Sequence, residues 1–85
     1  MIDVRPIDDT HFEVTVRGAV TTTHRVTVRP EYRSRLGCDD LDGAELVRRS
    51  LEFLLEREDN TSVLRRFDLS EIAGYFPEYE QAMRR

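Results

Sequence analysis

The chain is short and strongly ionic: of its 85 residues, 39% are hydrophobic and 35% are charged, with a formal net charge of −4. A chain of this length supports one core, so we expect a single domain over residues 1–85. An acidic total lacks the basic footprint that nucleic-acid binding usually requires. The single cysteine, Cys38, excludes an internal disulfide framework. Since there is also no secretory leader or long apolar run, we expect a cytoplasmic protein without membrane contact.

Two segments in the N-terminal third alternate between apolar and polar side chains, as half-buried strands do. The alternation runs from His11 to Arg17 and again from His24 to Arg29. Gly18 and a threonine-rich connection between the two segments favour an antiparallel hairpin formed within one chain. A further segment, Ile2 to Arg5, alternates too. The sequence leaves open whether it adds a third strand, which Pro6 would restrict to the edge of the sheet.

A long helix is predicted from Asp42 to Glu58 by apolar residues at helical spacing. Asp42 is expected to cap the first turn while Glu45 reaches back to the cap amide, which completes a capping box. The exposed face is expected to carry ion pairs four residues apart, Glu45 with Arg49 and Arg48 with Glu52.

Shorter helical segments are predicted on both sides of this helix. Pro30 is suited to begin a short helical turn that Gly37 ends. A second capping box, Asp68 with Glu71, predicts a helix over Leu69 to Phe76, and Pro77 opens a last turn through Met83. We therefore expect an α+β fold, in which an antiparallel two- or three-stranded sheet packs against one long helix with short C-terminal helices.

Three segments resemble a family of small bacterial proteins of unassigned function. They read THRVTV (Thr23 to Val28), LVRRSLEFLLERE (Leu46 to Glu58) and FDLSEIAGYFPEYE (Phe67 to Glu80). The resemblance covers most of the chain. It implies a free-standing domain and no particular site.

A looser resemblance links HRVTVRPEYRSRL and the helix after it to ribbon-helix-helix repressors and antitoxins, in which two chains pair their strands. It implies that Arg25, Thr27 and Arg29 enter the major groove of DNA, and that the amides of Gly43 and Ala44 clamp a phosphate.

This chain departs from the ribbon-helix-helix pattern in three places. The helix after Pro30 is too short, and acidic residues at 39, 40 and 42 crowd the expected phosphate position. The strand from Phe12 to Val16 would also occupy the edge that a second chain needs. We therefore rank DNA binding below the alternative of an interaction module.

No combination of residues predicts catalysis, a metal site or a cofactor. His11, His24 and Cys38 lack ligand spacing, so we expect both histidines on a strand surface and the cysteine as a bystander. The acidic run at 39–42 lacks the glycine and distal glutamate of a calcium loop, and the four glycines are too dispersed for a phosphate-binding loop. We expect no enzymatic activity and no cofactor.

Aromatic residues concentrate in the last third of the chain. Phe67 and Phe76 are expected in the core, whereas Tyr75 and Tyr79 lie four residues apart, a spacing that places two side chains on one helical side. These two tyrosines are the candidates for contact with a partner, although packing at the rim of the core is the favoured interpretation of both.

The leading interpretation is thus a non-catalytic interaction or structural module with an unidentified protein partner. The alternative is a dimeric DNA-binding regulator or antitoxin that uses Arg25, Thr27 and Arg29. The sequence indicates neither the biological process, nor the partner, nor the oligomeric state.

Overall fold

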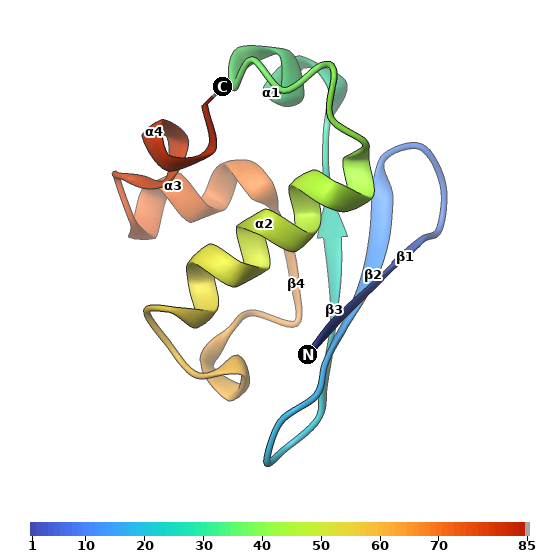
Figure 1. Cartoon of the computed structure of the whole chain (residues 1–85), viewed down its shortest axis with the longest axis vertical. Coiled ribbons are helices and arrows are strands. Elements are labelled where there is room, and N and C mark those ends of the chain that lie inside the picture. The colour runs from blue at the N-terminus through green and yellow to red at the C-terminus, as the bar shows by residue number, and fades with distance from the viewer. Residues whose placement is uncertain (85) are drawn as a thin grey trace.

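The computed structural model describes residues 1–84 as an α+β fold (Figure 1). A four-stranded mixed sheet in the order β1-β2-β3-β4 is accompanied by four α-helices. The strands are β1 (Ile2–Pro6), β2 (His11–Val16), β3 (Thr22–Thr27) and β4 (Arg66–Asp68). The helices are α1 (Pro30–Arg35), α2 (Gly43–Leu55), α3 (Ile72–Tyr75) and α4 (Tyr79–Met83), with single 3₁₀ turns η1 (Asn60–Ser62) and η2 (Leu69–Glu71). Figure 1 shows α2, α3 and α4 on one side of the sheet.

The central hairpin forms within the chain, as the alternating segments predicted. β2 pairs antiparallel with β3, which places Phe12 opposite Val26. β1 pairs antiparallel with β2, with Val4 opposite Val14, so the segment left open by the sequence is a third strand at the edge.

The prediction of a purely antiparallel sheet is wrong, because β4 adds a parallel strand beside β3. Arg66 lies opposite Arg25 in this pairing, and Phe67 lies opposite Val26. A strand of three residues has no measurable period, and its partner is far away in sequence, so only tertiary packing reveals it. β3 now has a neighbour on both sides. Pairing with the equivalent strand of a second chain, which the ribbon-helix-helix arrangement uses, would need a free edge that β3 does not have in this sheet.

The two predicted helix starts differ in how they are capped. Asp68 accepts a hydrogen bond from the amide of Ser70, and Glu71 accepts one from the amide of Asp68, both at 2.9 Å, so the second capping box forms. Asp42 occupies the cap position of α2, but its side chain makes no capping hydrogen bond.

The first capping box is absent because Glu45 serves two arginines instead. Its carboxylate lies 3.3 Å from Arg49, as predicted, and 3.7 Å from Arg48, which the sequence had assigned to Glu52. The start of α2 is fixed by packing: a Cβ on Gly43 would lie only 2.7 Å from the tip of the Phe12 ring. Glycine therefore lets α2 approach the sheet.

Candidate partner-binding groove

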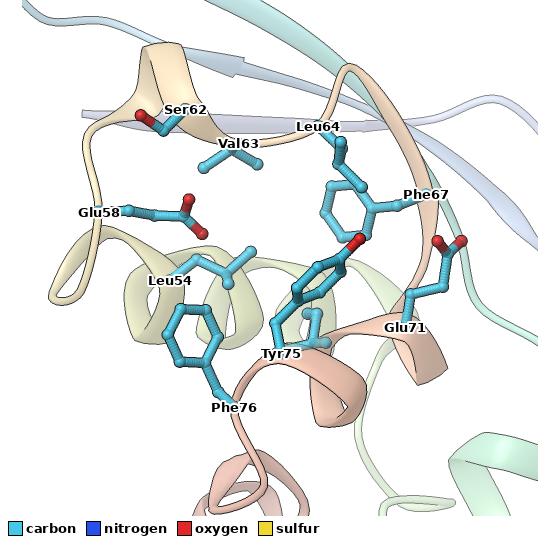
Figure 2. Close-up of a pocket in the computed structure, with 10 residues that line it drawn as sticks. Leu54, Glu58, Ser62, Val63, Leu64, Phe67, Glu71, Tyr75 and Phe76 are labelled. Atoms are coloured by element: carbon cyan, nitrogen blue, oxygen red, sulfur yellow. The ribbon is translucent and has the colours of Figure 1, made fainter.

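A groove of about 170 Å³ opens between the C-terminal end of α2, the segment from η1 to β4, and α3 (Figure 2). Its floor is apolar and consists of Leu54, Val63, Phe67, Ile72 and Phe76. Its rim carries Tyr75 and Leu64 together with the polar residues Glu58, Ser62 and Glu71.

Two large apolar side chains at this rim face solvent. Tyr75 is 67% exposed and Leu64 is 46% exposed, whereas the floor residue Ile72 is 3% exposed. In Figure 2 the Tyr75 ring lies in the middle of the lining residues, with Phe76 on one side and Phe67 and Glu71 on the other. Exposed apolar side chains gathered around one hollow are typical of a surface that another molecule covers.

One wall of the groove is held in place by a buried histidine. His24 is 1% exposed, so its predicted position on a strand surface is wrong. Its Nδ1 donates to the Leu64 carbonyl at 2.8 Å, and in the neutral ring Nε2 accepts from the Thr22 hydroxyl at 2.8 Å. Asn60 of η1 donates to the same hydroxyl at 2.9 Å. The sequence did contain a signal for this burial, because His24 lies two residues before Val26 and therefore on the same face of β3.

The opposite wall is α3, which the capping box at Asp68 and the buried side chains of Leu69 and Ile72 fix against the core. Tyr75 is its last residue. Phe76 then adopts an extended backbone before Pro77, because the residue that precedes a proline is disfavoured in the helical region.

This helix break separates the two candidate tyrosines. Tyr79 lies in α4 and is completely buried, so the prediction that it lies on one helical side with Tyr75 is wrong. Its hydroxyl lies 2.6 Å from Ser50 Oγ, and its ring meets Phe53 edge to face at 5.3 Å. Tyr79 thus joins α4 to α2, and of the pair only Tyr75 is available to a partner.

The groove has an acidic rim. The Glu58 carboxylate points into the groove from the side opposite Glu71 (Figure 2). Within residues 1–84 Glu58 forms no ion pair, and the Glu71 carboxylate receives only the amide of Asp68. Two carboxylates beside an apolar floor favour a ligand that combines an apolar group with positive charge.

The side chains with displaced pKa values lie outside the groove. Hydrogen bonds from the Thr10 amide and from His11 lower the pKa of Asp8 to about 2. The pKa of Glu78 is lowered by a hydrogen bond from its own amide and by Arg57. Burial raises the pKa of both Tyr32 and Tyr79.

Neither a metal cluster nor a membrane span is found in the described part of the chain. No three His, Cys, Asp or Glu side chains among residues 1–84 gather as metal ligands. Over the same range, no helix is long and apolar enough to cross a bilayer.

The residues of the DNA-binding alternative lie on the open face of the sheet, away from the groove. Arg25 is exposed beside Arg66, and neither side chain has an ion-pair partner within residues 1–84. Thr27 is half-buried, and Arg29 binds Asp68 at 2.9 Å. The structure therefore leaves Arg25 free on this face, occupies Arg29, and adds Arg66, which the sequence did not single out.

No family model, curated protein or solved structure matches this chain. The two resemblances noted from the sequence stay predictions. The geometry of the groove is therefore the basis for any statement about function.

Proposed function

We propose that this protein is a non-catalytic interaction module whose protein partner docks in the groove beside Tyr75. The exposure of Tyr75 is the observation that supports this proposal. Tyr32 and Tyr79 are 6% and 0% exposed, so the chain places its other two tyrosines inside and leaves Tyr75 over an apolar floor. Tyrosine is enriched at interfaces because it offers a large rigid ring and a polar tip.

The size of the groove favours a protein side chain over a small molecule. At about 170 Å³ the groove is smaller than the roughly 300–1,000 Å³ of typical small-molecule sites. It is large enough for one leucine or phenylalanine side chain. A partner would insert such an anchor between Tyr75 and Phe76 and cover Leu64.

The charge of the rim specifies what surrounds that anchor. Glu58 and Glu71 favour arginine or lysine next to the apolar residue, and the net charge of −4 attracts a basic segment from a distance. The proposed ligand is therefore a basic peptide segment with one large apolar side chain.

Selection from a random peptide library displayed on phage, with the folded protein immobilised, tests this proposal. We expect enrichment of peptides with one large apolar residue next to arginine or lysine. Tyr75→Ser should weaken binding of the selected peptides by about thirtyfold, which is typical of an aromatic hot spot. Val20→Ser is the matched control, because Val20 is 56% exposed and does not line the groove.

The charge of the rim is tested with a second variant of the same protein. Glu58→Gln should weaken the selected basic peptides and reduce the salt dependence of their binding. Peptides that bind Tyr75→Ser as tightly as the original protein, or a selection that enriches nothing, would contradict the groove as the partner site.

A DNA-binding regulator is the alternative that we rank lower. Arg25 and Arg66 offer two adjacent cations, but Arg29 is bound to Asp68 and Arg5 is bound to Glu13 on the same face. We expect only weak, non-selective binding of duplex DNA that disappears at physiological salt in fluorescence anisotropy. A sequence-selective complex that Arg25→Ala abolishes would reverse this ranking.

A further inference from the structure

One long edge of the sheet keeps unpaired backbone groups. β1 is the first strand in the order β1-β2-β3-β4, and within residues 1–84 no strand pairs with its outer side. Figure 1 shows β1 in front of β2 and β3, with no helix or loop drawn across it. Such an edge is a template for another strand.

The hydrogen bonds at both ends of β1 show which residues face outward. Met1 and Arg17 exchange backbone bonds of 2.9 and 3.2 Å, and the Ile7 amide donates to His11 at 2.8 Å. Because successive residues of a strand point their backbone groups to opposite sides, positions 1, 3, 5 and 7 face β2. Ile2 and Val4 therefore present both N–H and C=O to the outside, and Pro6 presents only C=O.

We propose that a second copy of this chain pairs its β1 with this edge, antiparallel and around a two-fold axis at Val4. In such a pair, residues whose backbone groups face outward must lie opposite each other. Three registers near the middle of β1 meet this condition. With Val4 opposite itself, the two Val4 residues exchange both bonds, and each Ile2 amide donates to a Pro6 carbonyl of the other copy. The result is a continuous sheet with the four strands of each copy.

Charge selects this register among the three. With Val4 on the axis, Asp3 of each copy lies directly opposite Arg5 of the other copy, and both project from the open face of the sheet. A shift in one direction places Asp3 opposite Asp3, and a shift in the other direction places Arg5 opposite Arg5. Like charges directly opposite are destabilising, whereas opposite charges stabilise the pair.

The open face already has a row of charges that the second copy would extend. Arg5, Glu13 and Arg25 lie side by side on β1, β2 and β3, and Arg5 is bound to Glu13. The Arg5 side chain as a whole is still 74% exposed, and its side away from Glu13 faces the free edge of the sheet. Asp3 of the second copy would occupy that side, so signs would alternate across the junction.

The face toward α2 also gains from pairing. A shallow hollow beside β1 is lined by the apolar residues Met1, Ile2 and Leu55 and by charged residues of α2. Met1 is 82% exposed, and Ile2 is half-buried. The β1 strand of the second copy would lie next to this hollow, along the unpaired edge of the sheet. It would remove apolar surface from water in both copies.

The oligomeric state of the full chain in solution is the first test. Sedimentation equilibrium over a wide range of protein concentration should show a monomer–dimer equilibrium without larger species, because the two-fold pairing closes. A monomer at every concentration would overturn the proposal, since Pro6 and the charges of β1 would then serve only to protect the edge.

A charge-reversal pair tests the register. Asp3→Arg places arginine opposite arginine, and Arg5→Asp places aspartate opposite aspartate, so each variant alone should dimerise about tenfold more weakly. Mixing the two variants restores both opposite-charge pairs, and native mass spectrometry should show the heterodimer in excess over either homodimer.

Two controls separate this pairing from general charge effects and from unfolding. Glu31→Arg and Arg65→Asp make the same charge changes at exposed positions away from β1, and they should leave the dimer constant unchanged. Thermal melting establishes that each variant is folded. Dimers that persist in both β1 variants, or a mixture without preference for the heterodimer, would refute the Val4-centred register.

Discussion

The contact between α2 and α4 predicts an unequal response to removing its two partners. The Ser50 hydroxyl donates to the Leu46 carbonyl at 2.8 Å, so the Tyr79 hydroxyl donates the 2.6 Å bond to Ser50. Tyr79→Phe removes one net hydrogen bond and should lower the free energy of unfolding by about 1 kcal/mol. Ser50→Ala instead leaves the Tyr79 hydroxyl buried without its acceptor, which should cost about 1–3 kcal/mol.

The double variant decides whether this hydrogen bond contributes to stability. Once Tyr79 is phenylalanine, Ser50→Ala no longer leaves a buried hydroxyl without a partner, so the second change should be almost neutral. We therefore expect an interaction energy of about 1–3 kcal/mol in the double-mutant cycle, equal to the cost of Ser50→Ala alone. Urea unfolding followed by circular dichroism gives the free energies, with unchanged m-values as the check on two-state behaviour. If the losses in unfolding free energy of the two single variants simply add in the double variant, the α2–α4 hydrogen bond does not stabilise the fold.

Three further perturbations test the core, the pH response and the C-terminal helices. Gly43→Ala should destabilise the protein by about 1–3 kcal/mol, because the new methyl group meets the buried Phe12 ring at 2.7 Å, whereas Gly74→Ala, with nothing within 4 Å, should not. The pKa of Asp8 falls from 3.8 to about 2 on folding, so its contribution is present above pH 4 and is lost as the pH falls from 4 to 2. Asp8→Asn should flatten the stability profile over that interval in acid titrations. Truncation after Asp68 removes two buried side chains of η2 and α3 together with Tyr79, and should abolish cooperative thermal unfolding.

Elements with a clear period could be predicted from the sequence, and elements fixed by distant contacts could not. The β2–β3 hairpin and α2 follow from hydrophobic spacing alone. β4 has only three residues. It pairs parallel with β3 only because α2 carries the chain back, so that both strands begin at the same end of the sheet. The capping boxes show the same limit: the Asp68 box forms from local residues, whereas at Asp42 the partner Glu45 is taken by arginines of the next turn.

The candidate site could be predicted only in part. Tyr75 was identified because tyrosine is common at interfaces and because of its place in the aromatic last third of the chain. Grouping it with Tyr79 relied on helical spacing, which does not hold across Pro77. Leu64 has no sequence signal as a rim residue, because it lies between η1 and β4 outside any periodic element, where its carbonyl accepts a hydrogen bond from the distant His24. A groove assembled from the end of α2, the segment from η1 to β4, and α3 is defined by tertiary packing, which periodicity along the chain does not encode.

The two proposed surfaces lie at opposite ends of the sheet, and this arrangement makes their functions separable. Phe67 of β4 belongs to the groove, whereas β1 is the other edge strand. Two copies joined through β1 would therefore carry their grooves at the far ends of the combined sheet and bind two partner segments at once. Tyr75→Ser should weaken the affinity for a soluble selected peptide and leave dimerisation unchanged. Arg5→Asp should leave that affinity unchanged and weaken binding only to a surface densely coated with the peptide, where a bivalent dimer gains from effective concentration.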